Sequence, residues 1–254
     1  MIRTIHFIYG LWDNNDEIPD NYRENLSSWI RLNPTWKVKV WNKEMINGLI
    51  NTTNNRKWND IISNNITPIQ YCDIARILVI YAEGGVYSDL DVVPNMSLDG
   101  LNILNDINNN KCVVGVEFPY QRIKQIVTDN YNRKRVRNIL KDTRINKLKW
   151  KTVPGHHLPK IRNRIAERLP RICNYFFASC PGHIYLKNCL DLISDRIHLP
   201  VNIEYDILYT TGPDIFSEAM AMNGSKVSLR IVPCHMLRKF TEHQCSGTWR
   251  WQSK

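Results

Sequence analysis

The fold of this chain is decided by residues 67–92, which read TPIQYCDIARILVIYAEGGVYSDLDV. Thr67 and Gln70 form a capping-box pair, and Pro68 suits the first position of a helix. Apolar residues then follow at helical spacing, namely Ile74, Ile77, Leu78 and Tyr81. A double glycine stops the pattern. The sequence therefore predicts a helix from Pro68 to Glu83, followed at once by a short strand.

Two carboxylates stand where that strand ends, at Asp89 and Asp91. Residues two apart on a strand point to the same side and lie about 7 Å apart along the chain. With a divalent cation and a diphosphate, they make an oxygen-rich site suited to Mg²⁺ or Mn²⁺. Such a cation would neutralise the charge that grows on a departing nucleotide diphosphate. Short acidic pairs on turns are usually only solvated, so this pair gains meaning from its surroundings.

Strand-like and helix-like segments alternate along the rest of the chain. Strands are predicted at 2–9, 36–41, 86–88, 112–116, 172–178 and 226–232. Helices are predicted at 19–32, near Met45, and at 58–62, 182–197 and 213–222. The apolar face expected for the first helix consists of Tyr22, Leu26, Trp29 and Ile30. This alternation predicts one α/β domain over residues 1–254 with a largely parallel sheet and a helical insertion at about 120–170.

Positive charge is concentrated in one segment. Residues 122–171 hold 16 Lys and Arg against three acids, which gives +13, whereas the whole chain carries +10. The remainder therefore sums to −3. So many charges must face water or an anionic partner. We expect the segment to serve the acceptor or an anionic membrane surface, and a merely solvated face is the alternative.

Targeting signals and cysteine patterns bear on location. The N-terminus does not read as a signal peptide, and no stretch approaches the roughly 20 apolar residues of a membrane span. The seven cysteines include no C-x-x-C pair and no zinc-ligand spacing, which is typical of reduced thiols. The sequence therefore predicts a cytoplasmic protein, with peripheral membrane contact through the basic segment as an option.

The run from Asp73 and Arg76 through Tyr87 to Asp89 and Asp91 resembles a known signature, D-x-x-R…GG-x-Y-x-D-x-D-V. It is that of the DXD-type glycosyltransferases, the family of the yeast initiating mannosyltransferase. The run is also similar to the catalytic domain of the clostridial large glucosylating toxins. The resemblance implies a GT-A fold, a Rossmann-like nucleotide-binding sheet, and transfer with retention of anomeric configuration.

Single residues take roles from the same resemblance. Ile8 and Tyr9 end the first strand, where the family stacks an aromatic ring on the donor's base. Asn174 matches an asparagine that faces the donor sugar. Asp73 would bind sugar hydroxyls, and Arg76 would contact sugar or phosphate. The simpler alternative for Asp73 and Arg76 is an ordinary ion pair between residues three apart on a helix.

The C-terminal stretch 243–249 resembles the family's H-x-W-x-G-S-W tail, although Gln244, Cys245 and Thr248 differ from it. Thr211-Gly212-Pro213 matches the family's T-G-P segment. His243 would be a third metal ligand, and Trp249 would close over the donor. Tyr87 is expected on the same side as Asp89. Core packing is the alternative for Tyr87 and Trp249, and an ordinary core or surface position is the alternative for His243.

These observations predict a metal-dependent glycosyltransferase that uses Mn²⁺ or Mg²⁺. Its expected donor is a UDP-sugar, with GDP-mannose second, and its acceptor is a hydroxyl of a glycan, lipid carrier or protein. The pI of about 9.3 leaves open an inactive transferase fold that binds nucleic acid or an anionic surface. No nucleic-acid module is recognised, so we expect no nucleic-acid partner. A phosphohydrolase using D-x-D would carry its acids after the first strand, which ends at Tyr9-Gly10.

Overall fold

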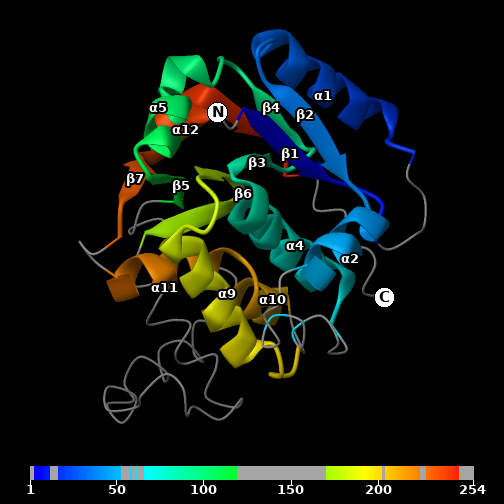
Figure 1. Ribbon diagram of the computed structural model, residues 1–254, viewed down its shortest axis with the longest axis vertical. Helices are drawn as coiled ribbons and strands as arrows, with labels where there is room; N and C mark the ends of the chain where they lie inside the picture. The colour runs from blue at the N-terminus through cyan, green and yellow to red at the C-terminus, as the bar shows by residue number, and fades with distance from the viewer. Residues whose placement is uncertain are drawn as a thin grey trace, which may run out of the picture.

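The computed structural model describes residues 3–11, 17–52, 58, 61, 66–118, 170–201, 204–223 and 227–245. A central sheet carries helices on both sides (Figure 1). The predicted insertion at 120–170, most of the predicted helix at 58–62, and Trp249 lie outside the described residues. None of the described helices combines the length and apolar character needed to cross a membrane.

Six strands form one sheet in the order β2-β1-β3-β6-β5-β7. They are β1 Thr4–Ile8, β2 Lys37–Trp41, β3 Gly85–Ser88, β5 Cys112–Phe118, β6 Arg171–Ser179 and β7 Leu229–Val232. β6 runs antiparallel to β3 and β5, whereas the other pairings are parallel. The largely parallel α/β sheet predicted from the sequence is thus confirmed. Because β6 is reversed, its first residues lie at the edge where β1 and β3 end.

Helices cover the two faces of this sheet. They are α1 Asp20–Leu32, α2 Lys43–Thr52, α4 Pro68–Glu83, α5 Ile103–Asn108, α9 Ile184–Arg196, α10 Glu204–Thr210, α11 Pro213–Asn223 and α12 Cys234–Phe240. A 3-10 turn, η1, spans Asp99–Leu101. In Figure 1, α4, α9, α10 and α11 lie below the sheet, and α1, α5 and α12 lie above it. Each face has its own core, one around Ile74 and Phe216 and the other around Trp29 and Phe240.

The predicted helix from Pro68 to Glu83 is confirmed with its bounds. Its capping box is present, since Gln70 N donates to Thr67 Oγ1 and Thr67 N donates to Gln70 Oε1. Every residue from Gln70 to Ile80 is buried, so the helix is buried all round and not only along its predicted stripe. The reason is its position, because α4 packs against the sheet as well as against α2, α9 and α10. Polar residues of α4 are therefore buried too.

The face predicted for the first helix is partly wrong. Ile30 is 53% exposed, and the buried residues of α1 are Asn25 and Trp29. Asn33 follows four residues later and is also buried. These three point at residues 90–98, where they hydrogen-bond to the backbone. Backbone groups without a strand partner need such donors and acceptors. For this reason polar side chains, and not Ile30, lie on the face of α1 that is turned toward residues 90–98.

A second, small sheet was not predicted from the sequence. β4 (Val92–Pro94) pairs antiparallel with β8 (Thr241–His243), and Val92 stands opposite His243. Strands of three residues carry too little pattern to be recognised, and the same is true of the short helices α5, α10 and α12. The other predicted elements that lie within the described residues are present, with ends that differ by up to three residues. The small sheet brings the C-terminal region beside Asp89 and Asp91.

Candidate active site

The candidate site lies at the sheet edge where β1 and β3 end and β6 begins. His6 pairs with Tyr87 in the parallel β1–β3 ladder, so both strands end beside each other. In the antiparallel β3–β6 ladder, Ser88 pairs with Phe176. Residues 174 and 175 therefore stand next to the D-x-D segment. Three strands that are far apart in sequence thus contribute side chains to one edge.

The D-x-D segment follows the end of the strand, as predicted, but it is a turn, so the strand geometry that was expected to place both acids on one side does not apply. β3 ends at Ser88, and Val92 N donates back to Asp89 O at 3.2 Å. Asp89 N donates to Tyr175 O at 2.9 Å, which anchors the start of the turn to β6. The chain must reverse here because β4 runs away from the main sheet to pair with β8.

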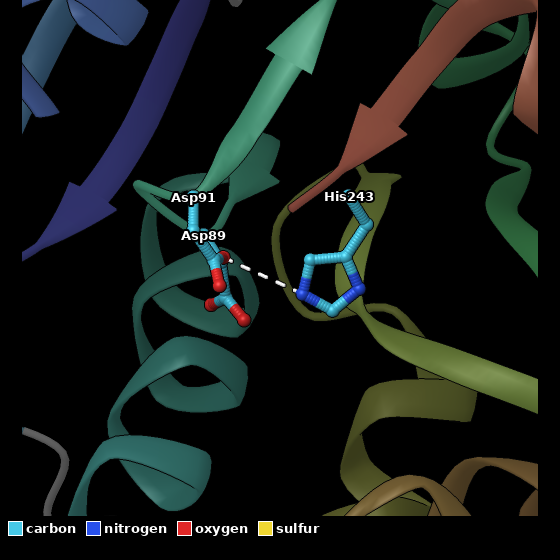
Figure 2. Close-up of side chains that lie close together, drawn as sticks. All are labelled: Asp89, Asp91 and His243. Carbon is cyan, nitrogen blue, oxygen red and sulfur yellow. Dashed lines mark ion pairs between the residues drawn. The ribbon is translucent and has the colours of Figure 1, made fainter. Parts of the chain in front are cut away.

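The turn nevertheless brings the three predicted metal ligands together. One ligand atom each from Asp89, Asp91 and His243 lies within 4.8 Å of the other two. Figure 2 shows the imidazole of His243 facing the two carboxylates, with its Nε2 at 3.4 Å from Asp91 Oδ1. Two carboxylate oxygens and one imidazole nitrogen form a donor set that suits Mn²⁺.

The charges of this cluster shift the pKa values of its members. Burial lowers the pKa of His243, but the hydrogen bond and charge of Asp91 outweigh burial, so the pKa is raised. Burial raises the pKa of Asp89, and the charge of Asp91 adds to that effect against the guanidinium of Arg76. Two neighbouring carboxylates repel each other unless a cation lies between them. A divalent cation bound there would offset that repulsion, so the residues present fit a metal ion.

The ring of His243 is held from its other side. It packs against the ring of Tyr175 at a tilt of 35°, with centroids 4.0 Å apart, and its Nδ1 lies 3.6 Å from Cys245 Sγ. These contacts leave Nε2 directed at the carboxylates. Partners of this kind orient the ligating nitrogen of a metal-binding histidine.

Asp73 is the buried centre of a hydrogen-bond network beside this cluster. Its Oδ1 accepts a hydrogen bond from Asn174 Nδ2 at 2.9 Å, and its Oδ2 accepts one from Thr211 Oγ1 at 2.9 Å. Arg76 Nη2 lies 3.3 Å from Oδ1. Burial raises the pKa of Asp73 to about 6, although Arg76 opposes the shift. The surface ion pair considered for Asp73 and Arg76 is therefore not what forms.

Arg76 joins this network to the D-x-D turn. Its Nη1 lies 3.4 Å from Asp89 Oδ2 and donates to Asn174 O at 3.1 Å. Its guanidinium is 5.2 Å from the centre of the Tyr87 ring. Tyr87 Oη donates to Asp89 Oδ1 at 2.6 Å, and the Tyr87 ring is buried in the core. Tyr87 thus meets both expectations, because it packs in the core and also faces Asp89.

Ile8 and Tyr9 stand at the end of β1, on the same sheet edge. Ile8 is buried in the core. Tyr9 is half-buried, and its ring meets that of Tyr22 on α1 edge-on at 6.5 Å. Tyr9 N donates to Trp41 O at 2.9 Å, which fixes its backbone to β2. Of these two residues, Tyr9 is therefore the one whose side chain is partly exposed at this sheet edge.

Some residues of the site were missed from the sequence. Thr211 was noticed in T-G-P but given no role, whereas it holds Asp73. Gln70, noticed only as a cap, also donates to Thr210 Oγ1 at 3.0 Å, so two bonds fasten α4 to the end of α10. Nothing in the sequence pointed to Asn25 on α1, which donates to Leu90 O within the D-x-D turn at 2.8 Å.

Comparison with known proteins agrees with this geometry. Residues 19–114 match the family described as glycosyltransferase sugar-binding region containing DXD motif. This part of the chain is therefore similar to the DXD region of that glycosyltransferase family. The matched residues include α1, α4 and the whole D-x-D turn. The resemblance seen in the sequence is confirmed by this match, and the expected α/β fold with a largely parallel sheet is confirmed by the sheet topology.

One curated relative and several solved structures are similar to the chain. Inositol phosphoceramide mannosyltransferase 3 of Schizosaccharomyces pombe is 33% identical over 96 residues, 37% of this chain and 26% of the relative. This chain therefore aligns with about a quarter of that relative's length. PaToxG glycosyltransferase has a TM-score of 0.47 at 15% identity, over 87% of this chain and 69% of that one. The UDP-bound glycosyltransferase domain of the YGT toxin has a TM-score of 0.40 at 9% identity, over 91% and 79%.

Proposed function

We propose that this chain transfers a sugar from a nucleotide-sugar donor to a hydroxyl acceptor, and that the transfer depends on a divalent cation. The observation that carries the proposal is the convergence of Asp89, Asp91 and His243 within 4.8 Å, next to the buried Asp73–Arg76 network. When bound, Mn²⁺ or Mg²⁺ neutralises the negative charge of the leaving diphosphate. The match to a DXD glycosyltransferase region supports sugar transfer as the reaction.

The chain's own residues supply orientation and fixed charge. Arg76 remains charged at any working pH, because the pKa of its guanidinium is raised by Asp89, Tyr87 and Asp73 even though burial lowers it. It therefore offers a permanent positive charge beside the D-x-D turn. Asp73 is held by Asn174 and Thr211, which suits it to align sugar hydroxyls. A group that already accepts two hydrogen bonds in a rigid network is pre-organised for binding.

Retention of configuration is part of the proposal. Asp73, the carboxylate nearest the expected sugar site, has both oxygens engaged by hydrogen-bond donors and is better suited to binding than to nucleophilic attack. The acceptor hydroxyl would then attack from the face that the diphosphate leaves. Its proton would pass to the departing phosphate oxygen. The new glycosidic bond keeps the anomeric configuration of the donor.

A UDP-sugar is the donor we propose first, with GDP-mannose second. Tyr9 at the end of β1 offers the aromatic face for the base, and the S. pombe relative is named a mannosyltransferase. The test is hydrolysis of a panel of UDP- and GDP-sugars with Mn²⁺, with Mg²⁺ and with excess EDTA. We expect hydrolysis of one donor class, dependent on the cation. Absence of hydrolysis for every donor favours the alternative of an inactive transferase fold, and full turnover in EDTA contradicts the metal site.

We further propose that the basic segment 122–171 meets an anionic acceptor or a membrane surface. It connects β5 to β6, and its two ends are joined, since Phe118 pairs with Arg171 and Glu117 Oε2 lies 3.2 Å from Arg171 Nε. β5 runs parallel to β3 because both are antiparallel to β6. The segment therefore leaves and re-enters the sheet at the edge that carries the D-x-D turn. A cytoplasmic location remains a prediction.

Charge reversal tests this second proposal. Arg133, Lys134, Arg135 and Arg137 are changed together to glutamate. Donor hydrolysis should persist, whereas transfer to the acceptor or binding to anionic liposomes should fall and lose its salt dependence, since each basic residue adds up to about 1 kcal/mol near such a surface. Unchanged transfer and liposome binding would mean a solvated face. Loss of donor hydrolysis would place the segment in the donor site instead.

A further inference from the structure

The D-x-D turn is held in place by groups that lie outside it. The carbonyl oxygen of Leu90 accepts from Asn25 Nδ2 at 2.8 Å, and that of Asp91 accepts from Gln244 N at 2.9 Å. The carbonyl oxygen of Val92 accepts from Trp29 Nε1 at 2.9 Å. Leu90 O lies in the turn and has no strand partner there, and buried carbonyls without partners are costly. Helix α1 and the C-terminal segment therefore determine the path of the turn.

Helix α1 contacts this path with side chains four residues apart. Asn25 and Trp29 lie on one stripe of the helix, and Asn33 follows as its C-cap residue. Asn25 and Trp29 donate to the carbonyls just described, and Asn33 Oδ1 accepts from Leu98 N at 2.7 Å. All three side chains are buried. The stripe thus aligns the helix with the chain from the D-x-D turn through β4.

Asn25 differs from the other two because it also reaches the C-terminal segment. Its Nδ2 donates to Gln244 Oε1 at 3.2 Å as well as to Leu90 O. Gln244 in turn donates its backbone N–H to Asp91 O and directly follows His243. The side chain of Asn25 thus bridges the turn that carries Asp91 and the segment that carries His243. Asn25 is 6% exposed, so water competes little for its bond to Leu90 O.

We propose that Asn25 is a positioning residue that fixes the spacing of Asp91 and His243 and thereby determines the affinity for the cation. The inference rests on the proposed function, since it assigns a role around the same cluster. Without the Asn25 amide, Leu90 O loses its donor, and Gln244 keeps only its backbone bond to Asp91 O. Asp91 and His243 then move apart more freely. Changes to groups that orient metal ligands typically reduce metal affinity about 10–100-fold.

The test compares Asn25→Ala with Asn33→Ala. Both residues are asparagines with similar burial, at 6% and 3% exposed, but only Asn25 donates to Leu90 O and Gln244 Oε1. Binding of Mn²⁺ to the full chain is measured from the electron paramagnetic resonance signal of free Mn²⁺, and donor hydrolysis is measured against Mn²⁺ concentration. We expect Asn25→Ala to bind Mn²⁺ about 10–100-fold more weakly. Its kcat at saturating Mn²⁺ should stay near the unaltered chain's, and Asn33→Ala should bind Mn²⁺ normally.

Gln244→Ala provides a second variant if Asn25→Ala does not fold. Gln244 is exposed, so removing its side chain spares the core while it breaks the same bridge. It should weaken Mn²⁺ binding in the same direction, and adding it to Asn25→Ala should have less effect than it has alone.

Two outcomes separate the inference from the proposed function. If Asn25→Ala and Gln244→Ala both bind Mn²⁺ as Asn33→Ala does, while Asp91→Asn loses binding, Asn25 has no positioning role and the metal site stands. If Asp91→Asn also binds Mn²⁺ like the unaltered chain, the metal site itself is wrong. A fall in kcat that excess Mn²⁺ does not rescue would also overturn the inference, because misplaced ligands alone are compensated by more cation.

Discussion

Asp73 and Arg76 stand one turn apart on α4, and the side chain of each is 5% exposed. Asp91 and His243 come from distant parts of the chain and are 13% and 22% exposed. The first pair is held by hydrogen bonds to Asn174 and Thr211. The second is more exposed and lies at the sheet edge. We refer to these as the buried network and the metal cluster.

The buried network and the metal cluster differ in burial, and this difference predicts which substitutions affect folding stability and which affect turnover. Removing one partner of a buried ion pair leaves a charge without compensation and destabilises the fold. Removing one charge from a partly exposed cluster costs little stability, because water replaces the lost partner. The metal cluster should therefore affect turnover and spare the fold, and the buried network should affect both.

The largest effect is expected from Asp91→Asn. Loss of this carboxylate should reduce donor turnover at least about 100-fold, because one ligand of the charge-neutralising cation is gone. The melting temperature in the absence of metal should stay close to that of the unaltered chain. Hydrolysis assays and circular dichroism melts measure the two effects. Turnover that survives the substitution would remove the metal cluster from the mechanism.

The buried network should show the opposite balance in Arg76→Leu. Asp73 then loses its cation inside the core, which should destabilise the fold by about 3–5 kcal/mol. Chemical denaturation measures this loss. The matched control is Arg23→Leu, since Arg23 also pairs with two acids, Glu17 and Asp20, but is 51% exposed. That change should cost at most about 1 kcal/mol. Equal effects of the two substitutions would show that burial does not distinguish the two arginines.

The pH dependence of stability sharpens the same contrast. The pKa of Asp73 is raised from 3.8 to about 6 in the folded protein, so the folded state holds this proton more tightly than the unfolded state does. The contribution of Asp73 to the free energy of unfolding is therefore fully present below pH 4. It is lost as the pH rises through 6, and the loss amounts to at most about 3 kcal/mol. Asp73→Asn cannot titrate. The difference in the free energy of unfolding between the Asp73→Asn variant and the unaltered chain should therefore shift in favour of the variant as the pH rises from 4 to 6. Urea unfolding at several pH values measures this difference.

The smallest effect is expected at Tyr9, which belongs to neither region. Tyr9→Ala should weaken binding of UDP about tenfold, since stacking of a base on an aromatic ring contributes roughly 1–3 kcal/mol. Stacking acts equally on ground and transition states, so kcat should change little. Calorimetric titration of UDP with Mn²⁺ present measures the affinity. An unchanged value would mean that Tyr9 only packs against Tyr22.

Helix α4 shows how far local pattern reaches. Its cap, its bounds and the strand that follows are written in adjacent residues, from Thr67 to Ser88. Hydrogen bonds between neighbours in sequence decide such features, so they are visible before any fold is known. The burial of Asp73 and Arg76 was not visible in the same residues. An i, i+3 pair reads the same on a solvated helix as on one enclosed by the sheet and three other helices.

The metal cluster, in contrast to helix α4, could be predicted only in part from local sequence. Asp89 and Asp91 were found from spacing and context, whereas His243 was singled out only through the resemblance to a family. Its position depends on the pairing of β4 with β8, two strands of three residues each. The bridge from Asn25 to Leu90 and Gln244 carried no signal at all. The sequence does not show whether an asparagine is buried or exposed, and only the packing of α1 on the turn makes Asn25 a buried residue.

The sequence by itself determined the α/β class, the helix and strand that frame the D-x-D turn, and the residue types able to hold a cation and a diphosphate. These follow from propensity, periodicity and ligand chemistry, which act over a few residues. Only the tertiary structure decided that β6 runs antiparallel, that Thr211 and Asn174 enclose Asp73, and that His243 meets Asp91. Those contacts join segments far apart in the chain, and which segments meet depends on how the whole core packs.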